Sequence, residues 1–540
     1  MNRHWNVARW IASAASALAL SSCGGAQSPS ATPVVVANAN VVASPPQIPE
    51  RRTAALPPLP ETPDAPFRQS APAPGQTPAF SPPVINRFTL RNGMTVMLVE
   101  RHDLPIVVAR YISRRGSDDV PVARAGLGQL VGTLIEQGTA RMGAIDFAGA
   151  LASIGAEHGS SVQWDHSAAF IKVLANQLPR AMELLADEIQ RPAFAESEFT
   201  RERDQQRDAL RQVTRDSPPL IGAITTYRAV YPANHPYSRP LLGTDESLQA
   251  LTRNDVVAFH RSHYVPSDSA LVVIGDVTRA ALQPLLDQYW TTWNARSTLV
   301  RATPPSPPAT AMPRISLVDR PRAPQSYVLV AQVGVPRSSP DYIPIQVMNT
   351  LLGGMFSSRI NLNLREAHAY TYGARSMFGF RRLAGPFTAG GAIIAAHTGP
   401  AVREILNELN RIRSSNVEPA ELAAAQSRLA ETLPSVFEGG EATSLAVGEI
   451  FVFRLPLDEY ATLSARVAAV TIADVRRVAE RYIDAEHSRI IVIGDHASVT
   501  PQLEALNLGA IEARNAHGDL VAAATAPGAT TPPSTPTTPH

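Results

Sequence analysis

The chain contains one ordered series of features twice, and this duplication constrains its fold more than any other feature of the sequence. The first copy spans residues 252–276 and the second spans residues 471–495. Each copy begins with a Thr that can cap a helix and an Asp three residues later that completes the capping pair. Each then ends in an apolar, β-branched strand followed by Gly-Asp. Two domains of the same topology are therefore expected.

Each half of the chain also opens in the same way, with two apolar strands joined by a short turn. These strands are expected at 94–99 and 105–111 in the first half, and at 314–318 and 327–331 in the second. Strands and long helical stretches alternate without a strict βαβ order. This pattern predicts an α+β fold of two homologous domains, each a mostly antiparallel sheet with helices packed on one face.

Composition supports two hydrophobic cores and excludes one class of partner. Of the 540 residues, 44% are hydrophobic, which is enough apolar material for two domains of roughly 200 residues each. The formal net charge is only +1, and acidic and basic residues are interspersed. Because a nucleic-acid binder needs a basic face, no nucleic-acid partner is expected.

Proline-rich segments separate the expected domains. Residues 24–85 and 507–540 lack sustained apolar periodicity, which predicts a flexible tether and a disordered Thr/Pro-rich tail. A shorter Pro-rich run divides the body between them. The predicted order is a signal peptide at 1–23, the tether at 24–85, the first domain at 86–300, a linker at 301–313, the second domain at 314–506 and the tail at 507–540.

The N-terminal segment has the features of a secretory signal. Arg3 and Arg9 precede an apolar run at 10–20, and the run ends in Leu-Ser-Ser-Cys at Cys23, the only cysteine of the chain. This tetrapeptide resembles the bacterial lipoprotein signal, which implies a lipid on Cys23. An ordinary cleaved signal with a chance cysteine is the alternative. Gly24 stands where the inner-membrane retention signal has Asp, so the outer membrane of a Gram-negative bacterium, facing the periplasm, is expected.

One helical segment carries the most specific motif. Residues 126–139 read Gly-Leu-Gly-Gln-Leu-Val-Gly-Thr-Leu-Ile-Glu-Gln-Gly-Thr. This resembles the zinc helix of insulinase/pitrilysin metallopeptidases, which have an inverted His-x-x-Glu-His motif followed by Gly-Thr. Two histidines at i and i+4 lie on one helical face and bind zinc, and the Glu before the second His polarises the attacking water.

The resemblance places other residues at every chemically essential position of that motif. Gln129 stands at the first His, Gly132 at the Glu and Thr133 at the second His. A Gln amide and a Thr hydroxyl are poor zinc ligands, and Gly132 has no side chain to accept a proton. Gly128, Gln129, Gly132 and Thr133 are accordingly interpreted as packing residues of a helix close to its neighbour, and no metal is expected in this chain.

The third zinc ligand of the family, a Glu on a later helix, is also replaced. It falls at Ala209, while the accompanying acidic position of the family is kept as Glu202. A register shifted by one residue would place Asp208 at the ligand position instead. One carboxylate cannot hold a catalytic zinc ion by itself.

The remaining candidate histidines are interpreted as structural. His260 and His263 have helical spacing, but they fall in the Phe-His-x-x-His-Tyr stretch of the family and are expected to pack or cap. His158 and His166 are separated by an expected turn and strand, with no Glu at a motif spacing. Neither pair predicts a metal site.

The second half keeps a different signature. Residues 351–374 contain Gly-Gly, Ser-Ser-Arg and Leu-Arg-Glu, with a Tyr seven residues after the Arg of Leu-Arg-Glu. This resembles the C-terminal signature of the family and implies that Arg365 and Tyr372 bind the substrate backbone and help stabilise the tetrahedral intermediate. A guanidinium and a phenol can both donate hydrogen bonds to an oxyanion. An ordinary salt-bridged Arg and a half-buried Tyr are the alternative, and Ala369 departs from the Gly that is usual in the family.

The resemblance covers about residues 86–500 and implies a specific role. In the two-subunit bacterial forms, one chain holds zinc and the other holds the Arg/Tyr pair. This chain matches the second, which predicts a heterodimer with a zinc-bearing homologue that cleaves peptides in the periplasm. A catalytically inert scaffold lipoprotein is the main alternative, and an independent peptidase with an unorthodox site is the third.

Overall fold

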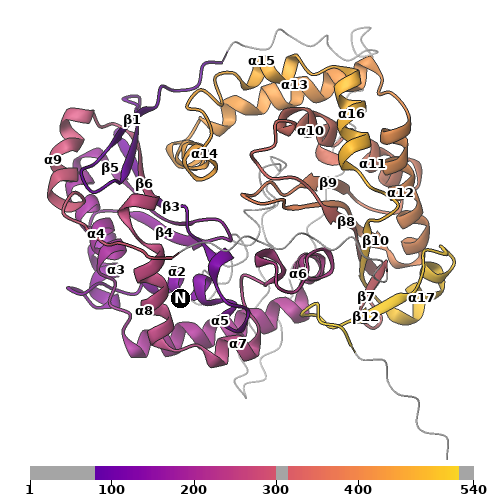
Figure 1. Ribbon diagram of the computed structural model, residues 1–540, viewed down its shortest axis with the longest axis horizontal. Helices are drawn as coiled ribbons and strands as arrows, with labels where there is room; N and C mark the ends of the chain where they lie inside the picture. Colours follow the sequence, from indigo (N-terminus) through magenta and orange to yellow (C-terminus); the bar gives the residue numbers. More distant parts are fainter. Residues whose placement is uncertain (1–79, 300–313, 522–540) are drawn as a thin grey trace, which may run out of the picture.

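The computed structural model describes residues 80–299 and 314–521, which form two halves that each contain a six-stranded mixed sheet (Figure 1). The lipidation candidate Cys23, most of the tether, the linker 301–313 and the end of the tail lie outside these ranges. Within the described part, no helix combines the length and apolarity needed to cross a bilayer.

The first half contains six strands and eight α-helices among its described residues. The strands are β1 (Asn86–Thr89), β2 (Thr95–Glu100), β3 (Ile106–Ser113), β4 (Glu157–Val162), β5 (Ser167–Leu174) and β6 (Ser269–Gly275). The helices are α2 (Leu127–Ile135), α3 (Ala144–Ser153), α4 (Leu178–Gln190), α5 (Glu196–Asp216), α6 (Pro218–Val230), α7 (Asp245–Ala250), α8 (Arg253–His263) and α9 (Arg279–Tyr289).

The second half repeats this content and adds two π-helical segments. The strands are β7 (Ile315–Asp319), β8 (Gln325–Val333), β9 (Ala374–Phe378), β10 (Pro386–Ile394), β11 (Arg489–Gly494) and β12 (Ile511–Arg514). The helices are α10 (Tyr342–Asn349), α11 (Arg359–Asn361), α12 (Thr398–Ser414), α13 (Pro419–Val436), α14 (Gly440–Phe453), α15 (Leu463–Ala468), α16 (Ile472–Tyr482) and α17 (His496–Glu504), with π-helical η7 (Thr350–Gly354) and η8 (Leu362–Ala367).

The two sheets share one topology. The order β2-β6-β3-β5-β4 in the first sheet corresponds to β7-β11-β8-β10-β9 in the second. In both series the first pair is parallel and the other three pairs are antiparallel. The sheets differ only in the strand added at one edge, β1 running antiparallel to β2 and β12 running parallel to β7. The predicted α+β fold of two homologous domains is confirmed.

The repeated helix starts are built by the same hydrogen bonds. The Thr252 hydroxyl accepts from the Asp255 amide (3.3 Å), and the Asp255 carboxylate accepts from the Thr252 amide (2.9 Å) at the start of α8. Thr471 and Asp474 make the equivalent bonds of 3.1 and 3.0 Å at the start of α16. Each of these capping boxes provides acceptors for two backbone amides that a helix N-terminus otherwise leaves unpaired.

Both faces of each sheet are buried, and one face is covered by a helix from the other half. In β6, Leu271 and Val273 face the helices of the first half, whereas Val272 and Ile274 face α14 of the second half. The reciprocal contact is made by α6 of the first half, whose Ile221 packs on β8 and β11. Figure 1 shows both helices lying between the two sheets. The prediction of helices on one face was therefore incomplete.

Small residues allow these two helices to approach the opposite sheet closely. A Cβ atom at Gly222 of α6 would lie 2.9 Å from Cδ1 of Tyr327 in β8. A Cβ atom at Gly448 of α14 would lie 3.2 Å from Cδ1 of Ile112 in β3. Because interior contacts shorter than about 3.4 Å require a shift, larger side chains at these positions would force each helix away from its sheet.

The equivalent hairpins of the two halves also meet. The loop between β9 and β10 carries Arg381, which is partly buried over the ring of Trp164 (4.2 Å), a residue of the β4–β5 loop. The next residue, Arg382, forms ion pairs with the buried carboxylates of Asp118 and Asp165. Breaking a buried pair of this kind costs about 3–5 kcal/mol. The two halves are therefore held together by ion pairs as well as by helices α6 and α14.

The C-terminal segment corrects one prediction. The tail was expected to be disordered from residue 507, but residues up to 521 are described and include β12. Arg514 of β12 is buried, its Nε donates to the Glu512 carboxylate (2.6 Å), and its guanidinium donates to the Gly518 carbonyl (2.6 Å). Asp519 pairs with Arg228 of α6 at 2.8 Å. A buried, paired Arg fixes this segment, so the prediction of disorder is wrong for residues 507–521.

Candidate functional site

Helix α2 carries the degenerate motif and is packed closely against its neighbours. It begins after Gly126, whose φ of 91° places it in the left-handed region that favours Gly. A Cβ atom at Gly132 would lie 3.1 Å from Cγ2 of Val162 in β4, and one at Gly128 would lie 3.0 Å from Cγ1 of the same residue. The interpretation of these glycines as packing residues agrees with this geometry.

The positions of the two missing histidines share one face of α2, as the motif spacing predicts. Gln129 and Thr133 are both partly exposed, and the Thr133 hydroxyl donates to the Gln129 carbonyl at 3.4 Å. Helix α5 packs against α2 and carries Ala209, also partly exposed. An amide, a hydroxyl and a methyl group do not fit a zinc ion, which prefers imidazole and carboxylate ligands.

Nearby carboxylates do not rebuild the site. Asp208 is exposed and pairs with Arg211 at 3.4 Å. Glu202 is buried and pairs with Arg201 at 2.8 Å, and its burial raises its pKa although Arg201 opposes the shift. Across residues 80–299 and 314–521, no three His, Cys, Asp or Glu side chains are grouped in a way that could hold a metal ion. The insulinase-type zinc site is therefore not supported by the residues present.

A buried acid close to α2 was missed in the sequence. Glu188 of α4 is 1% exposed, and its Oε1 atom has no hydrogen-bond partner. Burial raises the pKa of Glu188 well above its usual value, and the nearby carboxylate of Glu136 adds to the rise. A carboxyl group that holds its proton more strongly than usual is a poorer metal ligand. The available signal was Glu188 in an Asp-Glu pair between the apolar residues 184–186 and Ile189.

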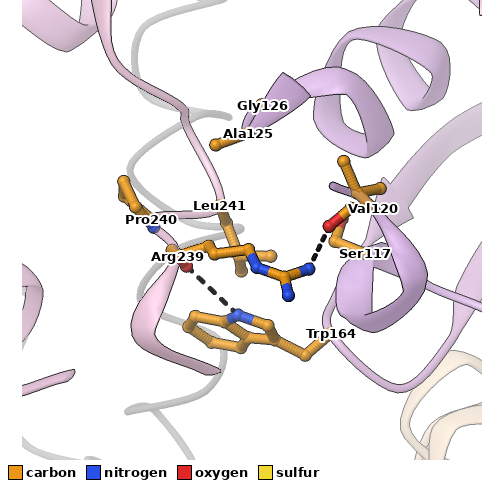
Figure 2. Close-up of a pocket in the computed structure, with 8 residues that line it drawn as sticks. All are labelled: Ser117, Val120, Ala125, Gly126, Trp164, Arg239, Pro240 and Leu241. Carbon is orange, nitrogen blue, oxygen red and sulfur yellow. Dashed lines mark hydrogen bonds between the residues drawn. The ribbon is translucent and has the colours of Figure 1, made fainter. Parts of the chain in front are cut away.

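A small hollow lies at the N-terminal end of α2 (Figure 2). Its walls include Ser117, Gly126, Trp164 and Arg239. The Arg239 guanidinium donates to the Val120 carbonyl, and the Trp164 indole donates to the Arg239 carbonyl at 3.3 Å. Burial lowers the pKa of Arg239. These groups bind loops of the same half to one another, so the hollow is part of the packing around α2.

The candidate histidines have structural contacts. His260 Nε2 lies 2.8 Å from the Ile189 carbonyl, and burial lowers the pKa of His260 to about 4. His263 stacks on Phe259 with ring centroids 3.7 Å apart. Burial likewise lowers the pKa of His166 to about 4. Uncharged, packed imidazoles match the structural interpretation of these residues.

The Arg/Tyr signature lies on a turn with an unusual backbone. Arg365 belongs to η8, and Tyr372 lies in the loop before β9. Between them, Ala369 has a φ of 53°, in the left-handed region that costs a residue with a Cβ atom about 1–2 kcal/mol. Its amide donates to the Arg365 carbonyl at 3.1 Å, which closes the turn. The turn expected of a Gly is therefore kept with Ala in its place.

Both signature side chains face solvent. Tyr372 is 86% exposed, and the Arg365 side chain is 36% exposed. Arg365 lies 4.5 Å over the ring of Phe356 and 3.4 Å from the Glu366 carboxylate. The alternative of a half-buried Tyr does not hold, because Tyr372 is outside the strand and almost fully exposed. Arg365 has an acidic neighbour but keeps an accessible guanidinium.

The structure keeps the two motifs apart within one chain. Helix α2 packs against β4, α5 and α8 of the first half. The η8 segment packs against α11 and α12 of the second half. Figure 1 shows α2 and the α11 region on opposite sides of the molecule. Arg365 and Tyr372 are therefore presented at the surface of the second half, away from the degenerate zinc helix.

Comparisons with known proteins agree with this two-part layout. The model described as "Insulinase (Peptidase family M16)" matches residues 112–245, and the model described as "Peptidase M16 inactive domain" matches residues 250–429. This chain belongs to the insulinase/pitrilysin (M16) family. The first match includes α2 and the second includes Arg365 and Tyr372, so each motif lies in the M16 domain in which the sequence placed it.

Relatives of this M16 chain include curated proteins of the same family. An uncharacterized zinc protease of Mycobacterium tuberculosis is 24% identical over 392 residues, which cover 71% of this chain and 87% of the relative. The mitochondrial-processing peptidase subunit beta of Mus musculus is 25% identical over 371 residues, which cover 66% of this chain and 74% of the relative.

Solved structures show the same M16 fold. A peptidase M16 inactive domain from Pseudomonas fluorescens aligns with a TM-score of 0.70 and 22% identity, covering 76% of this chain and 98% of the other. A protease from Helicobacter pylori aligns with a TM-score of 0.67 and 20% identity, covering 76% and 99%. At this level of identity the likeness concerns the fold alone.

Proposed function

We propose that this chain is the non-catalytic, substrate-binding subunit of a heterodimeric M16 zinc peptidase. Its partner is a zinc-bearing homologue, and the substrates are peptides. The observation that carries the proposal is the exposed Arg365/Tyr372 pair in a chain whose zinc helix offers Gln129, Gly132 and Thr133. A side chain that donates to an oxyanion must be accessible, and both of these are.

The need for a partner follows from the chemistry of peptide hydrolysis in this family. The metal-bound water is the nucleophile, and Gln129, Gly132, Thr133 and Ala209 at the motif positions of this chain do not form a ligand set for the metal. Arg365 and Tyr372 can act on a substrate only where a second chain supplies the zinc. The mouse relative is named as a subunit beta, which is consistent with a multi-chain peptidase. We further propose that a lipid on Cys23 anchors the subunit to the outer membrane, facing the periplasm.

Reconstitution with the zinc-bearing homologue tests this proposal. Removing an oxyanion donor costs roughly 10²–10³-fold in rate, so Arg365→Ala is expected to lower kcat/KM of the pair by about 100-fold, and Tyr372→Phe is expected to lower it less. Arg375→Ala is the matched control, because Arg375 is an exposed arginine of neighbouring β9 and its loss should leave activity unchanged.

The alternatives predict different results. A scaffold protein would leave the pair fully active after Arg365→Ala. An independent peptidase would hydrolyse peptides as a purified single chain and would contain stoichiometric zinc. Metal analysis and peptide cleavage with each subunit alone, and then with both together, separate these three outcomes.

A further inference from the structure

Phe356 is an exposed aromatic residue at the Arg365 site that the family signature does not explain. It lies in the turn between η7 and α11 and is 67% exposed. The guanidinium carbon of Arg365 lies 4.5 Å from the centroid of its ring. Single exposed apolar residues are common on protein surfaces, so the exposure of Phe356 bears on function only through its place beside Arg365. Arg365 covers part of the ring, and the remainder is free for another contact.

A buried side chain fixes Phe356 relative to Tyr372. The amide nitrogen of Asn361 donates to the Phe356 carbonyl at 2.7 Å. The amide oxygen of the same Asn361 accepts from the Ala374 backbone at 3.1 Å, two residues after Tyr372. Asn361 is itself buried. Because one rigid amide joins both loops, the positions of Phe356 and Tyr372 are coupled, with η8 and Arg365 between them in the sequence.

The two side chains of this contact have different binding roles. A guanidinium that lies over an aromatic ring keeps its N–H groups in its own plane, where they can donate to a carbonyl or an oxyanion. The ring has no hydrogen-bonding group, so the part that Arg365 leaves uncovered is suited to contact apolar atoms. A peptide whose backbone carbonyl binds Arg365 would therefore place a neighbouring side chain against the ring.

We propose that Phe356 is a specificity-determining residue of the Arg365/Tyr372 site and contacts a bulky apolar side chain of an extended peptide. The inference rests on the proposed function, since it requires that Arg365 binds substrate. It adds a substrate class to that function: peptides with a large apolar residue next to the carbonyl that Arg365 binds. Asn361 is a positioning residue that holds the ring in place.

The test uses the reconstituted pair and a set of fluorogenic 12-residue peptides. At each central position in turn, two peptides are compared that differ only in having Phe or Ala at that position. At one position the wild-type pair is expected to favour Phe by about tenfold or more in kcat/KM, in line with the discrimination of an apolar contact. Phe356→Ala should remove this preference, mainly through KM, while Phe356→Trp should retain it. Leu445→Ala, an exposed apolar residue on α14, is the control and should retain it.

Each remaining outcome has a defined meaning. If Arg365→Ala leaves the pair fully active, the proposed function fails, and this inference fails with it. If Arg365→Ala inactivates the pair but Phe356→Ala keeps the side-chain preference, the inference is overturned and the proposed function stands. If Phe356→Ala prevents co-purification with the zinc-bearing chain, the ring belongs to the subunit interface, which also overturns the inference. Thermal melting confirms that each variant is folded.

Discussion

Truncating Phe451 should weaken the sheet of the opposite half rather than the sheet of its own half. Phe451 lies near the end of α14, where it is buried against the first-half sheet together with Val447 and Ile450. The guanidinium of Arg114, at the end of β3, lies 4.2 Å over the Phe451 ring. Phe451→Ala therefore removes apolar contacts that β3 and β6 receive from the second half.

The expected magnitude follows from the burial of the ring. A buried Phe→Ala substitution costs about 3–5 kcal/mol in lost transfer energy and residual cavity. Each 1.4 kcal/mol is tenfold in an equilibrium constant, so amide protection governed by this contact should fall by about 100-fold or more. Leu445→Ala lies on the solvent side of the same helix and should change stability by less than about 0.5 kcal/mol.

Native-state hydrogen exchange measures this effect strand by strand. Protection should fall first at β3 and β6 of the first half, and less at β8 and β11 of the second. The reverse variant, Ile221→Ala in α6, should lower protection at β8 and β11, because Ile221 packs on the second-half sheet. If Phe451→Ala instead lowers amide protection only in strands of the second half, then α14 does not stabilise the sheet of the first half, and the interpretation given above is wrong.

Three further predictions test the site and its surroundings. Ala369→Gly should raise the free energy of unfolding, measured by chemical denaturation, by up to about 1 kcal/mol. Gly tolerates the left-handed φ of 53° without strain, and the greater entropy of its unfolded chain offsets part of this gain. A loss of stability would contradict the interpretation that Ala369 is strained. Burial raises the pKa of Glu188, so ionisation of this group in the unfolded state penalises folding as pH rises above about 4.5. Glu188→Gln should therefore match the wild type in stability near pH 4 and become progressively more stable than the wild type toward pH 8. A difference in stability that stays constant with pH in urea titrations would refute this. The triple variant Gln129→His, Thr133→His and Ala209→Glu should bind one zinc ion by metal analysis, and failure to bind would show that the register of the motif is wrong.

The duplication shows how far local sequence patterns extend. Thr252 and Thr471 each precede an Asp by three residues, and hydrogen bonds within four residues decide such a capping box. The strand pairs that open each half were also predictable, because their apolar runs and turns are local. The same locality explains the error in the tail. Arg514 looks solvent-exposed in a polar segment, but β12 pairs with the distant strand β7, where the Arg514 Nε donates to the Ser316 hydroxyl at 3.3 Å.

The degenerate motif was predictable because metal chemistry depends on residue type. No fold can make zinc ligands of Gly132 and Ala209, so the sequence alone predicts that the family site is missing. Glu188 could not be assigned in the same way. A Glu in an apolar run can reach solvent or stay buried, and only the packing of α4 decides that it is buried without a partner.

What the sequence alone predicted is the α+β class, the duplication into two domains, the replacement of the residues at the zinc-motif positions and the presence of the Arg/Tyr pair, since all of these depend on residue identity and short spacing. The sequence predicted helices on only one face of each sheet. Only the tertiary structure decided what covers the second face. Helices α6 and α14 cross to the opposite sheet because packing joins residues far apart in the chain according to shape, which no local pattern encodes.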